Sequence, residues 1–180
     1  MKKTFIVIAL LLLAGVSSAQ VFNTGQTLKA KTFSVGFEPA VLINGSNEFT
    51  LFLHGGYGLK RGIDFGLNIG VLGPENYFGA DVEFAIAKRI SLAVGAHDFG
   101  IFGLDGTLNF TIPIKSSIRL FSGLDLDVNF PENNDTQFLL WLPVGLEVGL
   151  KKNMSFIFEA EIGLTDPAYN LIGGGLNFYF

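Results

Sequence analysis

The side chains in this sequence with the clearest capacity for chemistry are acids that stand at alternate positions within apolar segments. If these segments are strands, one face carries ten acids: Glu38, Asp64, Asp81, Glu83, Asp105, Asp125, Asp127, Glu147, Glu159 and Glu161. Arg119 is the only base on that face, and His54 and His97 share it. So many carboxylates in one narrow space cannot all be ionised without water or counter-charge. They predict either a water-filled path that attracts cations, or a filled polar core in which acids bond to Arg119, to lysines at its ends, to tyrosines and to one another.

The two histidines raise the question of catalysis or metal binding. His97-Asp98 is the only adjacent His–acid pair, and hydrolases often pair His with an acid. Neighbouring residues in a strand face opposite ways, so this pair forms a dyad only if a turn redirects Asp98. No spacing specifies a metal site built from His54, His97 and an inward Asp. We therefore predict no catalytic residue, no metal and no cofactor, and the absence of cysteine excludes disulfides and thiolate chemistry.

The elements that must position these residues are short segments with a period of two. In the segment 154–164, Phe156, Phe158 and Ile162 lie on one face, and Glu159 and Glu161 lie on the other. A period of two with one apolar face is typical of a half-buried strand. We predict ten strands, at 32–42, 48–59, 63–72, 77–87, 90–98, 101–113, 117–130, 138–150, 154–164 and 168–180.

Two kinds of turn alternate between these segments. One set is rich in Asn, Gly, Pro and acids, at 44–47, 73–76, 131–136 and 165–167, and the other is basic, at 60–62, 88–89, 115–116 and 151–153. This alternation is typical of an up-and-down meander whose two ends face different environments. The connection at 98–100 is the least certain turn, and without it the fallback is eight strands.

The composition indicates whether the apolar face of the strands meets lipid or fills a core. Only 16% of the residues are charged and 49% are hydrophobic, yet beyond the N-terminus no apolar run reaches the ~18 residues of a spanning helix. The other structure that can span lipid is a closed β-barrel. The Lys and Arg residues lie at or near turns or before the first strand, as expected if the apolar face meets lipid, where a central Lys or Arg costs about 2–4 kcal/mol. We predict a transmembrane antiparallel β-barrel with an acidic lumen; a soluble periplasmic barrel is the alternative.

The N-terminus predicts export. Lys2 and Lys3 precede an apolar stretch at 5–14, and Ser17-Ser18-Ala19 supplies the small residues of a cleavage site. This pattern is typical of a signal peptide, with a retained anchor helix as the alternative. We expect a signal peptide at 1–19, an N-terminal periplasmic segment at 20–31 and the barrel at 32–180.

One strand breaks the regular pattern. Trp141 and Pro143 fall on the lumen face by parity. Proline in the middle of a strand predicts a β-bulge, which would reverse the parity and place Trp141 at the lipid interface.

Several other aromatic residues near strand ends are candidates for the girdles that flank a membrane band, namely Tyr57, Tyr77, Phe78, Phe130, Phe138, Tyr169 and Tyr179.

The last segment carries a resemblance to a known family. Ile172, Leu176, Phe178 and Phe180 share one face, and the final residue is aromatic. With the signal peptide and the meander, this segment resembles the small Gram-negative outer-membrane β-barrel superfamily, of the OmpA transmembrane domain and OmpX kind. The resemblance implies that these four residues form an assembly signal for the barrel-assembly machinery. It also implies periplasmic termini and basic turns, and extracellular acidic turns.

The function follows less directly than the fold. Every candidate loop is short, unlike the long extracellular loops of surface adhesins and proteases in such barrels. We predict a structural or narrow pore-like role without catalytic activity, and the alternative is a surface-exposed enzyme that acts on lipid or peptide. The expected partners are outer-membrane lipids and the assembly machinery. No basic patch predicts nucleic-acid binding, and the sequence leaves the oligomeric state open.

Overall fold

The structure, a computed structural model, describes residues 24–43, 47–132 and 135–180. The predicted signal peptide at 1–19 lies outside these residues, as do 44–46 and 133–134 in two of the predicted turns. The described residues form ten strands. Their bounds are β1 Phe33–Ile43, β2 Asn47–Lys60, β3 Ile63–Val71, β4 Tyr77–Ala87, β5 Ile90–Asp98, β6 Phe102–Lys115, β7 Ile118–Asn129, β8 Gln137–Lys151, β9 Met154–Gly163 and β10 Asn170–Tyr179.

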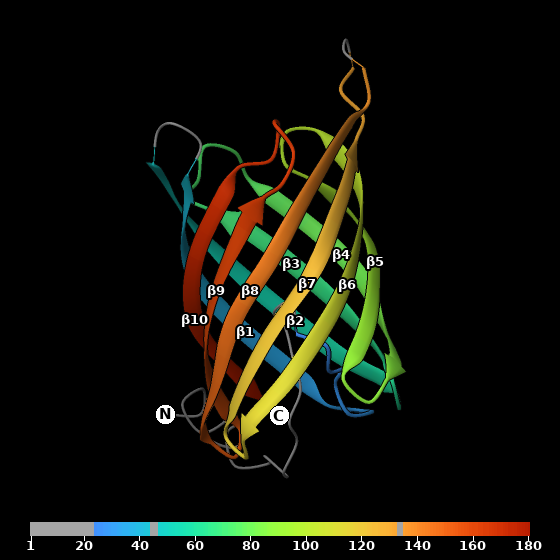
Figure 1. Cartoon of the computed structure of the whole chain (residues 1–180), viewed down its shortest axis with the longest axis vertical. Helices are drawn as coiled ribbons and strands as arrows, with labels where there is room; N and C mark the ends of the chain where they lie inside the picture. The colour runs from blue at the N-terminus through green and yellow to red at the C-terminus, as the bar shows by residue number, and fades with distance from the viewer. Residues whose placement is uncertain (1–23, 44–46, 133–134) are drawn as a thin grey trace, which may run out of the picture.

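These strands form one closed antiparallel barrel, in which sequence neighbours pair with each other (Figure 1). The pairing of β1 with β10 closes the barrel, with Phe37 opposite Leu176. The connection at 98–100 is a turn, because Gly100 adopts a φ of 70° and its N–H donates to Asp98 Oδ1 over 3.1 Å. The predicted up-and-down barrel of ten strands is confirmed, and the eight-strand fallback is wrong.

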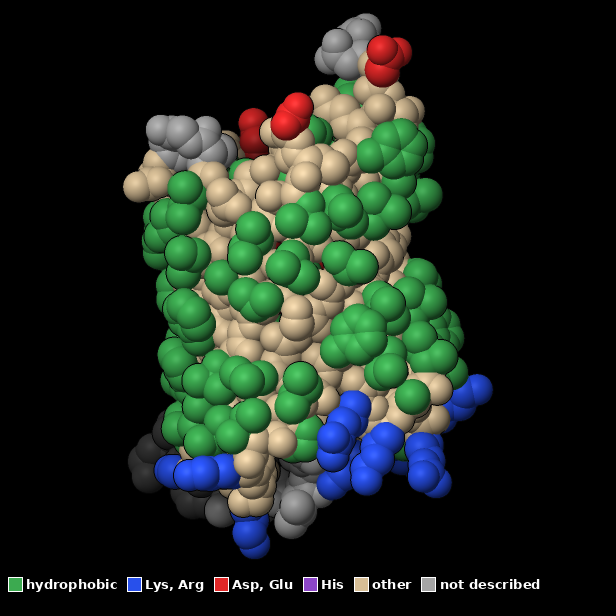
Figure 2. Space-filling view, viewed as in Figure 1, with side chains coloured by type: hydrophobic (Ala, Val, Ile, Leu, Met, Phe, Trp, Pro, Cys, Tyr) green, Lys and Arg blue, Asp and Glu red, His purple; other side chains and the backbone are tan. Residues whose placement is uncertain are grey.

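The two ends of the barrel are built differently. At the end with the basic turns, each of the four hairpins has a two-residue turn and a register shift, for example between Gly58 and Lys60. A β-bulge of this kind increases the local twist and helps the chain to reverse. Figure 2 shows Lys and Arg at this end, here called the basic end, and Asp and Glu at the other, the acidic end. The connections at the acidic end are longer.

The outer wall of the barrel is apolar. Alternate side chains along the strands point outward, and large ones such as Phe158, which is 46% exposed, remain uncovered on every strand. Figure 2 shows these side chains spread over the wall between the charged ends. Soluble monomers rarely expose apolar patches larger than a few hundred Å², so a continuous wall of this kind is suited to lipid. Within the described ranges, no helix has the length and hydropathy to cross a membrane.

Glycines on the inner face make room for the acidic side chains. A Cβ placed on Gly66 would overlap the carboxylate of Asp81, its partner on β4, and a Cβ on Gly173 would overlap that of Glu38. Alternating small and large residues fill the taper of small barrels in this way. The inward glycines of the sequence therefore let carboxylates lie flat against the neighbouring strand.

A short N-terminal segment, residues 24–31, enters the basic end, and we call it the N-terminal plug. Leu28 is 1% exposed and packs against Tyr179 of β10. Its N–H donates to the carboxylate of Asp64, and the N–H of Gly25 donates to Thr111 Oγ1 over 2.8 Å. Part of the segment predicted to be periplasmic thus lies inside the mouth of the barrel and forms the floor of the lumen.

Candidate binding site in the barrel lumen

A cavity of about 190 Å³ lies in the lumen above the plug. Its walls reach from Tyr77 and Tyr169, which adjoin loops of the acidic end, to Asp64 and Asn109. The floor lies near Asn109, because the backbone of Gly25 in the plug approaches the carbonyl of that residue. The cavity is therefore bounded by the plug on one side and by aromatic side chains on the other.

Carboxylates dominate the cavity wall. Among the ten acids predicted for the lumen, Glu147 is buried without lining the cavity. The other nine line it, namely Glu38, Asp64, Asp81, Glu83, Asp105, Asp125, Asp127, Glu159 and Glu161. His54 lines the cavity with them, and no Lys or Arg belongs to this wall among the residues that the structure covers.

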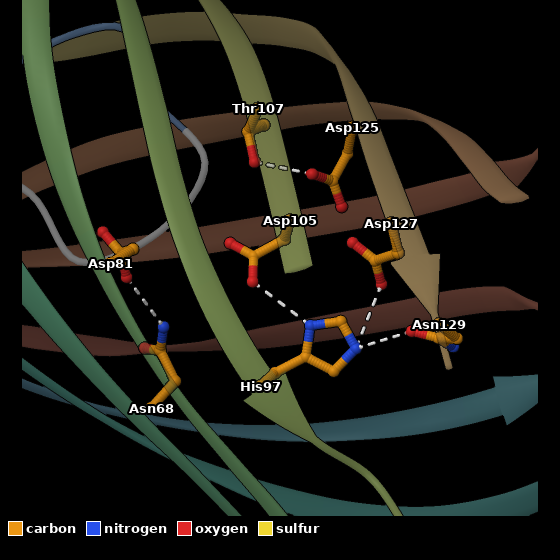
Figure 3. A network of polar contacts seen from close by, with 8 residues as sticks. All are labelled: Asn68, Asp81, His97, Asp105, Thr107, Asp125, Asp127 and Asn129. Atoms are coloured by element: carbon orange, nitrogen blue, oxygen red, sulfur yellow. Dashed lines mark hydrogen bonds and ion pairs between the residues drawn. The ribbon is translucent and has the colours of Figure 1, made fainter. Parts of the chain in front are cut away.

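His97 is the centre of one polar network, which Figure 3 shows. Its Nδ1 lies 3.1 Å from Asp105 Oδ1, and its Nε2 lies 3.1 Å from Asn129 Oδ1 and 3.6 Å from Asp127 Oδ2. The ring of Tyr77 stacks on the imidazole at 5.7 Å. These contacts connect the neighbouring strands β4, β5, β6 and β7 along one side of the inner wall.

Other polar contacts lie on the inner wall apart from the His97 network. His54 lies between Asn68 Oδ1, 2.9 Å from Nδ1, and Glu38 Oε2, 3.0 Å from Nε2. In Figure 3, Thr107 Oγ1 donates to Asp125 Oδ1 over 2.6 Å, and Asn68 Nδ2 donates to Asp81 Oδ2 over 3.4 Å. Sequence reasoning missed the amide and hydroxyl partners, although the parity that places the acids inward also places Asn68, Thr107 and Asn129 there.

Aromatic side chains cluster at the acidic end of the cavity. Phe99 contacts both Tyr77 and Tyr169, at ring distances of 6.0 and 6.4 Å. Trp141 packs on Tyr169 at 5.7 Å, and its Nε1–H donates to the Tyr169 carbonyl over 2.7 Å. Phe52 packs edge-on against Tyr77. These five rings narrow the acidic end of the lumen.

The expected β-bulge at Pro143 is wrong. The residues on either side keep one register with β7, with Ser122 opposite Val144 and Asp125 opposite Trp141. Trp141 is only 3% exposed and lines the cavity. Pro143 lies where β7 and β8 have no recorded pairing, so its missing N–H disrupts the ladder without adding a residue.

Of the girdle candidates, Phe78, Phe130 and Phe138 are exposed on the outer wall, whereas Tyr77, Tyr169 and Tyr179 lie inside.

Arg119 joins the plug to the barrel wall. Its Nη2 donates to Glu147 Oε1 over 2.6 Å, and its Nη1 donates to Gln26 Oε1 of the plug over 2.7 Å. The hydroxyl of Tyr179 also donates to Glu147 Oε1, over 3.3 Å. The recorded hydrogen bonds of Arg119 therefore lie at the floor of the lumen, and none of them reaches an acid of the cavity wall.

The geometry offers little for catalysis or for a metal. Asp98 is exposed and points away from His97, as neighbours in a strand do. The recorded polar partners of His97 are acids and an amide, with no hydroxyl nucleophile among them. The portion of the chain that the structure describes contains no group of three or more His, Asp or Glu arranged to hold a metal ion.

The four residues of the predicted assembly signal lie on the last strand and at its end. Ile172 is exposed on the outer wall, and Leu176 and Phe178 are half-buried beside it. Phe178 stacks on Phe37 of β1 at 6.5 Å. Phe180 exchanges two backbone hydrogen bonds with Phe33, so the strand end is part of the barrel closure.

A closed antiparallel barrel with an apolar outer wall and a polar lumen is a transmembrane β-barrel.

No protein-family model matches the chain, and no curated protein matches it. Solved outer-membrane barrels are similar to it. They include the N-terminal barrel domain of Pseudomonas aeruginosa OprF, with 14% identity, a TM-score of 0.41, and 84% of this chain and 98% of that chain covered. The Yersinia pestis protein Ail in a nanodisc has 11% identity and a TM-score of 0.45, with 83% of this chain and 99% of that chain covered.

Proposed function

We propose that the protein is a structural β-barrel of a Gram-negative outer membrane, without an open pore and without catalytic activity. The N-terminal plug is the observation that carries this proposal. Its backbone is fastened to Asp64 and Thr111, and its Gln26 is held by Arg119. Beyond the plug, the His97 network and the aromatic cluster occupy the lumen. Side chains can largely fill barrels of about this strand number.

The orientation in the membrane is part of the same proposal. The basic end would face the periplasm and the acidic end the exterior, with outer-membrane lipids around the wall. The short connections at the acidic end support a structural role over that of a protease or adhesin with long surface loops. His97 is buried, at 5% exposed, and this weighs against a surface enzyme.

Planar-bilayer recording tests whether the lumen is closed. We expect the folded protein to give no conductance steps in concentrated KCl, because the plug and the side-chain networks interrupt a water path. Folding would be checked by the shift in gel mobility on heating that β-barrels show. Reproducible steps from protein that passes this check would reject the closed barrel in favour of a pore.

We also propose that Ile172, Leu176, Phe178 and Phe180 form the signal read by the barrel-assembly machinery. Phe180→Ala should lower the amount of folded barrel in the outer membrane several-fold, because the last strand would be recognised poorly. Phe138→Ala is the matched control, since it removes an exposed aromatic ring from another strand. Equal amounts of folded barrel for both variants in fractionated membranes would contradict the assignment.

A further inference from the structure

A groove in the outer wall crosses β6, β7, β8 and β9. Its cavity volume is about 460 Å³, within the range of about 300–1,000 Å³ that is typical of ligand sites. Among the described residues that line it, only Ser122 carries a polar side chain. Ser122 pairs with Val144, and Val144 pairs with Ala160, so small side chains lie side by side in one row of the wall. The larger rings of Phe110 and Phe158 border this row and form the sides of the groove.

Pro143 accounts for the small polar residue in this row. The pairing of β7 with β8 is not recorded at Pro143, because proline has no N–H to donate to the ladder. Beside this interruption, the hydroxyl of Ser122 donates to the Pro143 carbonyl over 3.0 Å. Serine is the smallest side chain that can make this hydrogen bond, and a polar group that faces lipid needs such a partner. The groove therefore follows from the way in which the barrel tolerates a proline in the middle of a strand.

The end of the barrel below this groove is positively charged. Exposed Lys or Arg side chains lie in all four basic turns and in the plug, and no Asp or Glu occurs in these turns or at 24–31 (Figure 2). Two of the turns end the hairpins that carry the groove, with Lys115 in one, and Lys151 and Lys152 in the other. These two turns are neighbours, because the N–H of Gly149 donates to the carbonyl of Ser117 over 2.8 Å.

The distance between these lysines and the groove suits a lipid. Ile112 lines the groove and precedes Lys115 by three residues, and Leu146 lines it and precedes Lys151 by five. At about 3.3 Å per strand residue, these separations are about 10 and 17 Å. One leaflet of a bilayer contributes about 15 Å of hydrocarbon. A lipid headgroup at the two turns therefore brings its acyl chain to the depth of the groove.

Charge favours a lipid over a second copy of this chain as the occupant. Copies in one membrane share an orientation, so a dimer through the groove would bring two basic ends together. Like charges within a Debye length of about 8–10 Å repel each other. An anionic phospholipid instead brings a phosphate to the lysines and an apolar chain to the groove, as basic sites at membrane surfaces do for acidic lipids.

We propose that the groove and its two basic turns bind one anionic phospholipid of the leaflet at the basic end. The headgroup phosphate lies at Lys115 and Lys151, and one acyl chain occupies the groove between Phe110 and Phe158. This site rests on the proposed function, because acyl chains meet the outer wall only when the barrel lies in a membrane. It adds to that function the class of lipid and the place where the lipid is held.

Native mass spectrometry of the folded protein, released from detergent micelles, tests the site. The protein would be titrated with phosphatidylglycerol, or with phosphatidylcholine that carries the same acyl chains, after the shift in gel mobility on heating has shown that it is folded. We expect one phosphatidylglycerol molecule to be retained per barrel, with an affinity at least about tenfold higher than that of phosphatidylcholine. Equal affinity of the two lipids for folded protein would overturn the proposal.

Two charge variants locate the headgroup. The double variant Lys115→Gln and Lys151→Gln should weaken phosphatidylglycerol binding about tenfold and leave phosphatidylcholine binding unchanged. Lys60→Gln with Lys88→Gln is the matched control, since it removes the same charge from two basic turns that do not adjoin the groove. It should bind like the original chain. Equal losses in both double variants would mean attraction to the whole basic end and would reject this site.

Two variants of the wall locate the acyl chain. Ala160→Leu fills the groove and should weaken phosphatidylglycerol binding several-fold. Ala96→Leu is its control, because Ala96 pairs with the outward Leu104 on a part of the wall that does not line the groove. Unchanged affinity in folded Ala160→Leu would place the acyl chain elsewhere and overturn the proposal.

A separate measurement distinguishes failure of this site from failure of the proposed function. The protein would be folded in vesicles of phosphatidylcholine alone and of phosphatidylcholine with phosphatidylglycerol. Insertion into both vesicles, without selective retention of phosphatidylglycerol in the titration, would reject the lipid site and leave the membrane barrel standing. A chain that inserts into neither vesicle would reject the membrane barrel, and the lipid site with it.

Discussion

Replacing Gly58 by leucine is expected to release the N-terminal plug. Gly58 faces the plug so closely that a Cβ there would overlap the carbonyl of Lys29, and its own carbonyl accepts from Lys31 N over 2.7 Å. A leucine side chain would occupy the space of the plug backbone. The amides of Gly25 and Leu28 would then lose their acceptors, the neutral hydroxyl of Thr111 and the carboxylate of Asp64. Hydrogen exchange should speed up to about tenfold at Gly25 and about 10- to 100-fold at Leu28, since a hydrogen bond contributes about 0.5–1.5 kcal/mol with a neutral partner and about 1.5–3 kcal/mol with a charged one.

A second glycine of the same strand provides the control. Gly55 faces away from the plug, and a Cβ there would meet only Leu67 at ordinary contact distance. Gly55→Leu should therefore leave the exchange of Gly25 and Leu28 unchanged. Both variants would be followed by NMR in nanodiscs, after heat-dependent gel mobility has shown that they fold. If Gly58→Leu kept both amides protected, the plug would not depend on the close approach at Gly58.

Replacing Arg119 by methionine is expected to lower the free energy of unfolding by about 3 kcal/mol. The carboxylate of Glu147 is almost fully buried, and the guanidinium is its only charged partner recorded in the described structure. Loss of that partner leaves a buried charge uncompensated, which typically costs about 3–5 kcal/mol. We expect the lower part of this range, because the Arg119 side chain is itself 21% exposed.

The double variant Arg119→Met and Glu147→Leu separates the ion pair from the space it fills. It should regain most of the lost stability, because replacing both partners by apolar residues removes the uncompensated charge. Lys115→Met, at an exposed site of a neighbouring turn, should change stability by less than about 0.5 kcal/mol. Urea unfolding in lipid vesicles, followed by Trp141 fluorescence, gives these values. Equal stability of Arg119→Met and the original chain would show that the pair contributes nothing to the floor.

The strands could be predicted because two simple signals agree. Side chains alternate along each segment, and turn residues or basic pairs separate one segment from the next. The signals were weakest at 98–100, the least certain of the predicted turns, where Gly100 and Asp98 form a short turn. The same alternation indicates which residues share the inner face. It does not indicate which of them contact each other, because those contacts depend on the stagger of strands around the barrel.

Two features lay beyond reasoning of this kind. The plug has no periodic pattern, and its contacts join residues far apart in sequence, such as Gly25 with Thr111. The position of Trp141 depended on whether Pro143 adds a residue to its strand. Proline disrupts the hydrogen-bond ladder whether or not the strand contains an extra residue. Only the register of the neighbouring pairs distinguishes a β-bulge from a ladder that lacks a hydrogen bond.

The order of strand pairing also predicts an order of folding. Nine of the ten pairings join strands that are adjacent in sequence, whereas β1 with β10 joins the two extremes of the barrel. Hairpins close short loops and form quickly, but the final pairing must close a loop of well over a hundred residues. Until β10 arrives, β1 has an unpaired edge that can join another chain. The chain therefore needs protection from aggregation until its last strand is in place.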